Sequence, residues 1–229
     1  VTFILIISTG LFGSQNPIEN LTPTFIWIIW WVGFTIFTAF WGNLWPTINP
    51  FAIIYDFISA LYSKLTNEDL SFNLTYPKQL GITPALILFM IFVWFETIYP
   101  ESGTPSHIAV AIILYLMVTF TGMLVFGKTC WLKHGEAFSI LFYLLSLCSI
   151  TEIQGKGHLY QLRIRPLAAG LMKKQSSSWG TVVFIMIALG SVSFDGLSET
   201  PLWVDITIFS EPFFRNFGQF VAINSVGLL

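Results

Sequence analysis

The sequence predicts an all-α fold: a polytopic bundle of transmembrane helices with interfacial helices and a small cytoplasmic hairpin. Three observations predict it, namely the composition, a series of apolar runs that begin at helix-start signals, and an uneven distribution of basic residues. Of the 229 residues, 55% are hydrophobic, 17% are aromatic and only 10% are charged, and the mean hydropathy is +0.75. Soluble domains carry about 25% charged residues, so this chain belongs in a bilayer.

The charge and the cysteines exclude several classes of protein. The net charge is -2 with ten basic residues, too few for the dense basic surface of a nucleic-acid-binding protein. Membrane lipids and other membrane protein subunits are the expected partners. Cys130 and Cys148 show neither CxxC spacing nor a nearby pair of histidines, so we interpret both as small packing residues.

Both ends of the chain stop inside apolar runs. The chain begins with "VTFILIISTGLFG", which lacks a starting Met and a basic segment, and it ends with "FVAINSVGLL". We therefore expect 1–229 to be a single integral membrane domain, cut at both ends, with partial spans at 1–12 and 213–229.

Four complete spans are predicted between these ends, at 23–45, 84–99, 107–126 and 179–194. The first begins at Thr22-Pro23, with Thr as N-cap and Pro at the first helical position. Its 23 residues extend about 34 Å, and its tryptophans, including Trp45 at the far end, suit two interfacial belts. Thr83-Pro84 repeats the start signal, and Gly127 ends the third complete span.

Two apolar stretches of about 15 residues are too short for a straightforward span. Residues 51–65 follow the cap pair Asn49-Pro50 and have an apolar face that includes Ile54, Ile58 and Leu61, so a helix in the membrane surface is expected. Residues 135–150 are expected to form a surface or re-entrant helix.

The basic residues support this topology. If 135–150 does not cross, the loops on one side contain no Lys or Arg, and nine of the ten basic residues fall on the other side; these are Lys64, Lys78, Lys128, Lys133, Lys156, Arg163, Arg165, Lys173 and Lys174. The positive-inside rule then places the basic loops in the cytoplasm and the acidic loops outside a prokaryotic cytoplasmic membrane.

The basic segment 151–166 alternates apolar and polar residues in "HLYQLRIR" after a Gly-Lys-Gly turn, which predicts a hairpin. Arg163 and Arg165 project from one face of it. They suit either an anion or nucleotide site or contact with lipid headgroups, and the headgroup interpretation is preferred.

A carboxylate, Glu96, interrupts the apolar run "LFMIFVWFETIYPESG" near the outer end of its span. Together with His107, Asp195 and Glu199 it is a candidate ligand set for a divalent metal. The preferred interpretation is structural: we expect Glu96 to face neighbouring helices and to bond a backbone amide or hydroxyl, with 195–200 as the expected neighbour.

His134 and Glu136 form a second candidate pair in "KHGEAF". Residues two apart do not share a helix face, so joint metal binding would need a loop. The preferred interpretation places Glu136 at the start of the next helix, where its charge complements the helix dipole. Motifs of zinc peptidases, serine hydrolases, nucleotide hydrolases and c-type haem proteins do not occur in the sequence.

Several stretches, in order, carry a resemblance: "SQNPIENLTPTFIWIIWWVG", "INPF", "YPKQLG", "WFETIYP", "HGEAFSILF" and "SFDGLSETPLW". Over about residues 13–204 the chain resembles the fenitrothion hydrolase-like membrane proteins of bacteria and archaea. The resemblance implies hydrolysis of an organophosphate triester by a metal-bound hydroxide. Glu96, Glu136 and Asp195 lie within the matching motifs and are the candidate catalytic residues.

Three functions follow as hypotheses. The first is a non-catalytic subunit of a larger membrane assembly, packed against other chains by aromatic-rich helices. The second is a membrane-embedded, metal-dependent ester hydrolase at the outer face. The third is a small-molecule transporter or channel component, although a chain of buried carboxylates, which ion conduction would need, is not visible in the sequence.

Overall fold

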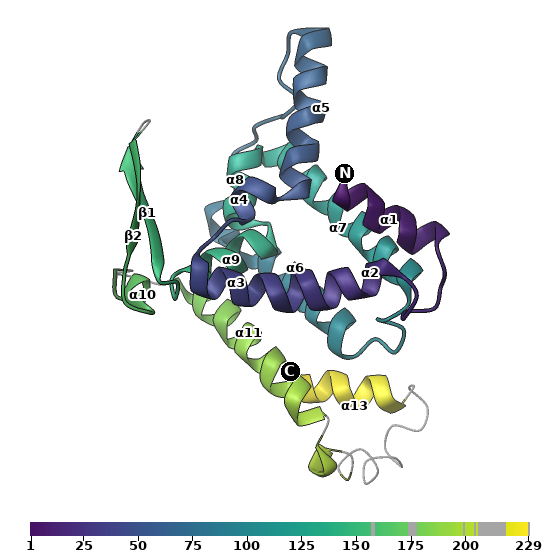
Figure 1. Cartoon of the computed structure of the whole chain (residues 1–229). Coiled ribbons are helices and arrows are strands. Elements are labelled where there is room, and N and C mark those ends of the chain that lie inside the picture. Colours follow the sequence, from purple (N-terminus) through teal and green to yellow (C-terminus); the bar gives the residue numbers. More distant parts are fainter. Residues whose placement is uncertain (157–158, 174–177, 199, 204, 206–218, 229) are drawn as a thin grey trace.

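The computed structural model describes residues 1–156, 159–173, 178–198, 200–203, 205 and 219–228. These residues are mostly helical, which confirms the all-α prediction (Figure 1). The N-terminal elements are α1 (Thr2–Phe12), α2 (Leu21–Pro23), η1 (Thr24–Phe34), α3 (Thr35–Trp41), α4 (Trp45–Ile48), α5 (Pro50–Thr66) and η2 (Lys78–Leu80). The remaining elements are α6 (Thr83–Thr97), α7 (Pro105–Phe126), α8 (Lys128–His134), α9 (Ala137–Ser146), β1 (Thr151–Lys156), β2 (Leu159–Ile164), α10 (Ala169–Lys173), α11 (Trp179–Ser198) and α13 (Gln219–Leu228).

Three helical segments in the described part of the chain are long and apolar enough to cross a membrane. They are Leu21–Trp41, which joins α2, η1 and α3 into one rod, Pro105–Phe126 and Trp179–Ser198. Helices α1, α6 and α9 are apolar but shorter. The predicted span 84–99 corresponds to α6, whose 15 residues extend about 22 Å, less than the hydrocarbon thickness of a bilayer.

The helical segment Leu21–Trp41, which corresponds to the predicted span 23–45, begins earlier than the sequence predicts. Asn20 is the N-cap, and its side chain accepts a hydrogen bond from the Thr22 amide at 2.9 Å. The predicted cap, Thr22, instead donates its hydroxyl to the Ile6 carbonyl at 2.7 Å and so ties this helix to α1. The prediction was wrong because a tertiary partner occupies the Thr22 hydroxyl, while Asn20 is an equally good local cap.

This helix also ends earlier than predicted, at Trp41 rather than Trp45. Gly42 stops it with a φ of 97°, a left-handed conformation that glycine adopts at little cost. Trp45 then starts the separate short helix α4, and its side chain is only 2% exposed. It is therefore a core residue and does not belong to an interfacial belt.

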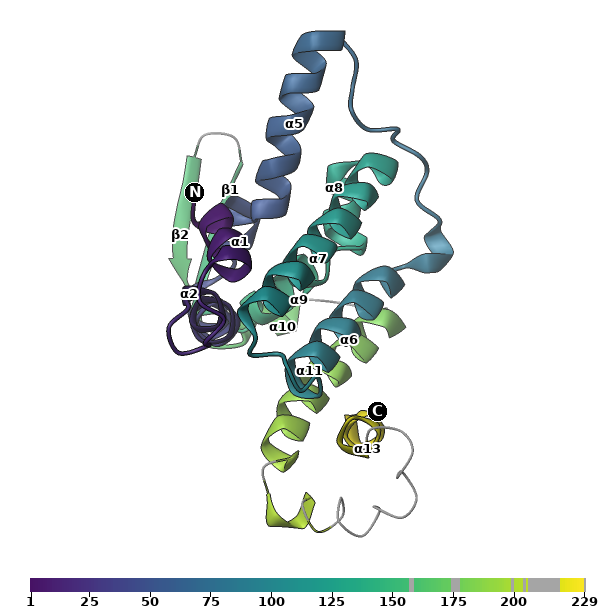
Figure 2. The same cartoon turned by 90° about the vertical axis from the view of Figure 1, so that its right-hand side faces the viewer.

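The predicted cap pair before 51–65 is confirmed. The Asn49 side chain accepts hydrogen bonds from the amides of Phe51 and Ala52 at 3.0 and 3.3 Å. Helix α5 packs on the bundle through its first turns and then projects away from it, roughly perpendicular to the 21–41 rod (Figures 1 and 2). Beyond the first turns its apolar side chains are open, with Leu61 51% exposed.

The hairpin predicted at 151–166 is confirmed, since β1 and β2 pair antiparallel with Glu152 opposite Arg163. Part of the predicted turn lies outside the described residues. Arg165 does not present a free cation: its guanidinium donates to the carbonyls of Ser146 and Ser149 at 2.7 and 2.9 Å, at the C-terminal end of α9. Arg163 is exposed.

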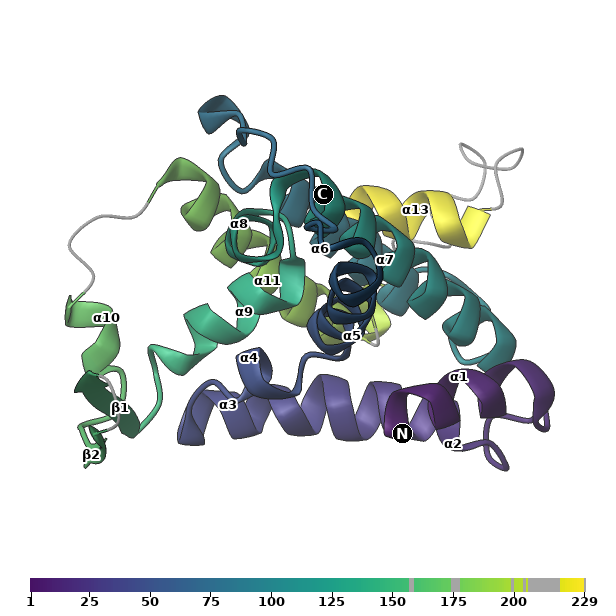
Figure 3. The ribbon, with the colours of Figure 1, turned by 90° about the horizontal axis from the view of Figure 1, so that it is seen from above.

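The predicted helix 135–150 corresponds to α9, which has ten residues and extends about 15 Å, too short to cross a bilayer. It runs from the middle of the bundle outward to the hairpin (Figure 3). Its N-terminal half lies in the main core, with Ala137, Phe138 and Leu141 each at most 5% exposed. The described structure thus places the start of α9 inside the molecule.

Candidate functional site: an aromatic cavity above a buried carboxylate

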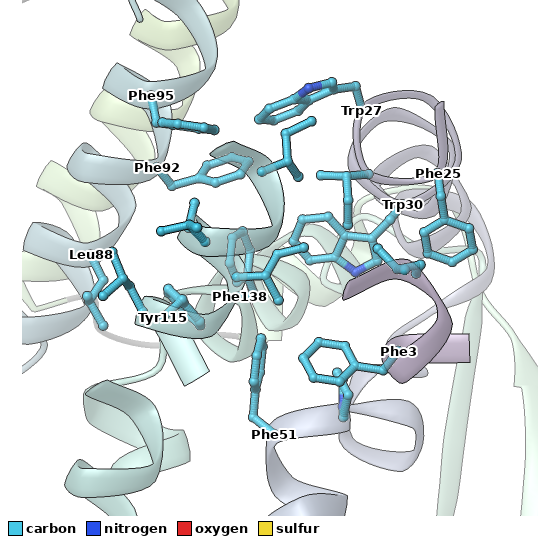
Figure 4. A pocket seen from close by; sticks show the side chains of 18 of the residues that line it. Phe3, Phe25, Trp27, Trp30, Phe51, Leu88, Phe92, Phe95, Tyr115 and Phe138 are labelled. Atoms are coloured by element: carbon cyan, nitrogen blue, oxygen red, sulfur yellow. The ribbon is translucent and has the colours of Figure 1, made fainter. Parts of the chain in front are cut away.

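A cavity of about 780 Å³ lies between α1, η1, α6, α7 and the beginnings of α5 and α9 (Figure 4). Its lining is almost entirely apolar and aromatic. Several side chains at its border are open to the outside, including Ile91 at 59% and Leu114 at 53% exposure, so the cavity opens across an apolar rim.

Helical spacing aims the lining residues at the cavity. Leu88, Ile91, Phe92 and Phe95 follow the i, i+3, i+4, i+7 pattern and line one wall from α6. The opposite wall is the segment η1, which carries Trp27 and Trp30.

Aromatic rings interlock at the cavity floor. The centroid of Trp30 lies 4.6 Å from that of Phe138 in an edge-to-face arrangement and 5.8 Å from that of Trp45. Tyr115 lies 5.3 Å from Phe138 and 5.1 Å from Phe51. Such ring pairs stabilise one another beyond their apolar burial.

Glu136 lies directly behind this floor and is fully buried, at 0% exposure. Its Oε1 accepts from the Tyr115 hydroxyl at 2.6 Å and the Phe138 amide at 3.0 Å. Its Oε2 accepts from the Trp45 indole at 3.1 Å and the Ser139 amide at 2.6 Å. Two of these donors belong to cavity-lining side chains and two to the first turn of α9.

The donor pattern fits an ionised carboxylate. The Tyr115 oxygen itself accepts from the Ala137 amide at 3.2 Å, which leaves its proton for Glu136. All four groups that meet Glu136 therefore donate, whereas a protonated carboxyl would need an acceptor. The N-terminus of α9 adds a favourable dipole. The interpretation of Glu136 as a helix-start residue is confirmed, because it is the N-cap of α9.

One end of the cavity has a polar group. His107 Nδ1 lies 3.0 Å from Glu101 Oε2 and 3.3 Å from the Tyr99 hydroxyl, and both His107 and Tyr99 line the cavity. His107 is thus paired with Glu101, a residue outside the predicted ligand set.

Glu96 lies away from this centre, in a shallow hollow beside Trp31 and Ser102. It is partly buried and faces the Trp31 indole, with the Asp195 carboxylate close enough to repel it. Glu96 therefore faces neighbouring helices as predicted, and Asp195 of the predicted segment lies near it. The polar group that faces its carboxylate is the Trp31 indole, whereas the prediction named a backbone amide or hydroxyl.

Of the predicted metal ligands, Glu96 and Asp195 lie near each other, whereas His107 pairs with Glu101. In the described part of the chain, no three His, Cys, Asp or Glu side chains form a group that could hold a metal ion. Glu199 lies outside the described residues. His134 contacts the Cys130 carbonyl at 3.0 Å and stacks on Tyr76 at 5.1 Å, while Glu136 points toward Tyr115 and Trp45. These two residues therefore do not form the pair that the sequence suggested.

Sequence reasoning missed Trp45 and Tyr115, the two side chains that link Glu136 to the cavity. The only local signal is the density of aromatic residues, which predicts burial and does not specify a partner.

Comparisons of the chain with protein families, curated proteins and solved structures give no match. The fold and the site define a class, an apolar helical bundle with an aromatic cavity. The resemblance to fenitrothion hydrolase-like proteins stays a hypothesis.

Proposed function

We propose that this chain is an integral membrane protein that binds an apolar small molecule in the aromatic cavity at the level of the bilayer. The observation that carries the proposal is the cavity itself. Its volume of about 780 Å³ lies within the range of small-molecule sites, and such sites are mostly apolar with a few polar groups. Here the polar groups are at one end, around Tyr99 and His107.

The surroundings of the cavity support a membrane-borne ligand. The rim residues Ile91, Val110 and Leu114 are all at least 46% exposed, and they face lipid if Pro105–Phe126 crosses the membrane. An apolar molecule dissolved in the bilayer would then enter without passing through water. In this proposal the basic loops face the cytoplasm of a prokaryotic cell and the acidic loops face outward.

Binding is favoured over hydrolysis by the chemistry of the lining. Among the described lining residues, the titratable side chains are Tyr99, His107 and Tyr115. His107 is bonded to Glu101 and Tyr99, and Tyr115 donates to Glu136. An activated nucleophile needs a base within hydrogen-bond reach, and the described lining does not pair one with Ser, Thr or Cys.

The test is quenching of tryptophan fluorescence in neutral detergent by a brominated long-chain alcohol, since Trp27, Trp30 and Trp45 line the cavity. We expect saturable quenching. Ala111→Phe, which fills the cavity from α7, should abolish the saturable part, while the matched Ala60→Phe in the exposed part of α5 should retain it. If the Ala111→Phe variant shows the same saturable quenching as the unsubstituted chain, the proposal is wrong.

A second function, a subunit of a larger membrane assembly, is favoured by one observation about α5. Its outer turns project away from the bundle with exposed apolar residues, including Phe57 at 72% and Leu65 at 76% (Figure 2). This surface suits a second membrane protein or the interfacial layer of the bilayer. Replacing Phe57 and Leu65 by serine should separate a partner during native purification; an unchanged assembly would exclude a subunit interface on α5.

A further inference from the structure

The cavity floor carries a negative charge. Glu136 is fully buried, and its four hydrogen-bond donors are all electrically neutral groups. The ion pairs of the described side chains involve His107, Lys128 and Arg165, and none of them includes Glu136. Neutral donors spread the charge of a carboxylate but do not cancel it, so its field extends into the low-dielectric space around it.

The negative potential of Glu136 reaches the cavity. Tyr115 and Trp45 bond the carboxylate at 2.6 and 3.1 Å and also line the cavity, so one layer of side chains separates Glu136 from a bound molecule. These side chains and their neighbours Trp30 and Phe138 are aromatic (Figure 4). The faces of aromatic rings carry negative electrostatic potential and attract cations.

The buried charge of Glu136 and the aromatic, apolar lining together decide which kind of ligand the cavity prefers. An anion would be repelled by Glu136, and a neutral molecule would gain nothing from its charge. A small hydrated cation such as Na⁺ would lose its water shell without gaining oxygen ligands, because the lining is almost entirely apolar. An organic cation with an apolar body satisfies both the charge and the lining.

We infer that the cavity prefers lipophilic organic cations of the quaternary ammonium or phosphonium type. This inference rests on the proposed function, since it specifies the ligand class of the same cavity. The cationic centre lies against the rings of Trp30, Trp45 and Tyr115, and the apolar substituents extend along α6 and α7 toward the rim.

The experiment compares two probe ions of nearly equal size and shape, tetraphenylphosphonium and tetraphenylborate, by titration calorimetry on the whole chain in a neutral detergent. The Ala111→Phe variant gives the background of binding to the micelle. We expect the phosphonium to bind at least about tenfold more tightly than the borate after this correction. Equal affinities, or a tighter borate, would overturn the inference but leave the cavity as an apolar site. Failure of both ions and of the brominated alcohol to bind would overturn the proposed function as well.

Glu136→Gln locates the source of the preference. It keeps the side-chain shape and removes the charge, so the preference for the phosphonium should fall by about tenfold. Glu68→Gln removes an exposed carboxylate outside the cavity lining and should leave the preference unchanged. If both variants act alike, or if folded Glu136→Gln retains the full preference, the inference fails. Where Glu136→Gln does not fold, the comparison of the two ions on the unsubstituted chain still decides.

Discussion

Two carboxylates in apolar surroundings, Glu96 and Glu136, have opposite environments. Glu96 interrupts a long apolar run, yet it lies in a shallow hollow at the end of α6, partly exposed and facing one indole. Glu136 follows a Lys-His-Gly sequence that resembles a loop, yet it is fully buried and accepts four hydrogen bonds.

The difference teaches that the number of hydrogen-bond donors around a carboxylate, and not the polarity of its neighbours in the sequence, decides whether the carboxylate can be fully buried. Glu136 obtains two donors from the start of its own helix and two from side chains distant in sequence. Tyr115, which supplies one of them, is in the middle of α7, so Glu136 lies at the level of the bundle centre. Polar groups at that depth are retained when they have complete sets of partners.

The largest expected effect comes from Glu136→Ala. It leaves two side-chain donors and two backbone amides buried without an acceptor and removes the N-cap of α9. We expect a loss of about 3 kcal/mol or more in the free energy of unfolding, or failure to fold. Thermal unfolding in detergent, followed by circular dichroism, measures it. An unfolding temperature equal to that of the unsubstituted chain would show that Glu136 is not a structural centre.

Tyr115→Phe sharpens the comparison by removing one donor. The 2.6 Å bond to Glu136 Oε1 and the 3.2 Å bond from the Ala137 amide are both lost, so we expect about 1–3 kcal/mol of destabilisation. Tyr62→Phe in α5 is the matched control and should change stability by less than about 0.5 kcal/mol. The same unfolding measurement applies, and equal effects of the two variants would contradict the donor argument.

Arg165→Gln tests the opposite end of α9. The guanidinium donates to the Ser146 and Ser149 carbonyls, and it favours the negative end of the helix dipole, so we expect a loss of about 1–2 kcal/mol. Arg163→Gln, on the same strand but exposed, should have almost no effect. If Arg163→Gln lowers the free energy of unfolding more than Arg165→Gln does, the basic hairpin stabilises the protein through contacts with lipid headgroups and not through contacts with α9.

The smallest effect is expected for Glu96→Gln. The amide keeps an acceptor for the Trp31 indole and removes the repulsion from Asp195, so stability should change by less than about 0.5 kcal/mol. Unfolding of this variant beside Glu136→Gln gives the direct comparison. A cost for Glu96→Gln as large as that for Glu136→Gln would show that both carboxylates are equally essential and would break the contrast.

Local signals predicted the elements that depend on neighbouring residues. Asn49-Pro50 starts α5, Gly127 ends α7, and the alternating residues before Arg165 form a strand, all as the sequence predicts. Helix caps, terminating glycines and the alternation of apolar and polar residues act over a few residues, so their effect does not depend on the tertiary arrangement.

Predictions failed where distant residues compete for the same group. Thr22 is not the N-cap because its hydroxyl binds the Ile6 carbonyl, 16 residues away. Trp45 is not in an interfacial belt because its indole binds Glu136, 91 positions along the chain. A composition rich in tryptophan predicts burial or an interface equally well, and only the long-range partner distinguishes them.

The sequence by itself determined that this protein is a helical, strongly apolar chain with a short basic hairpin. Composition is a property of the whole chain and periodicity is a property of each short segment, so neither depends on how distant segments pack. The tertiary structure alone decided where the charge lies. It turned a helix-start glutamate into the buried anion of an aromatic cavity by bringing α4, α7 and α9 together around it. The physical reason is that a carboxylate inside an apolar bundle needs several donors at once, and those donors come from segments that only folding makes neighbours.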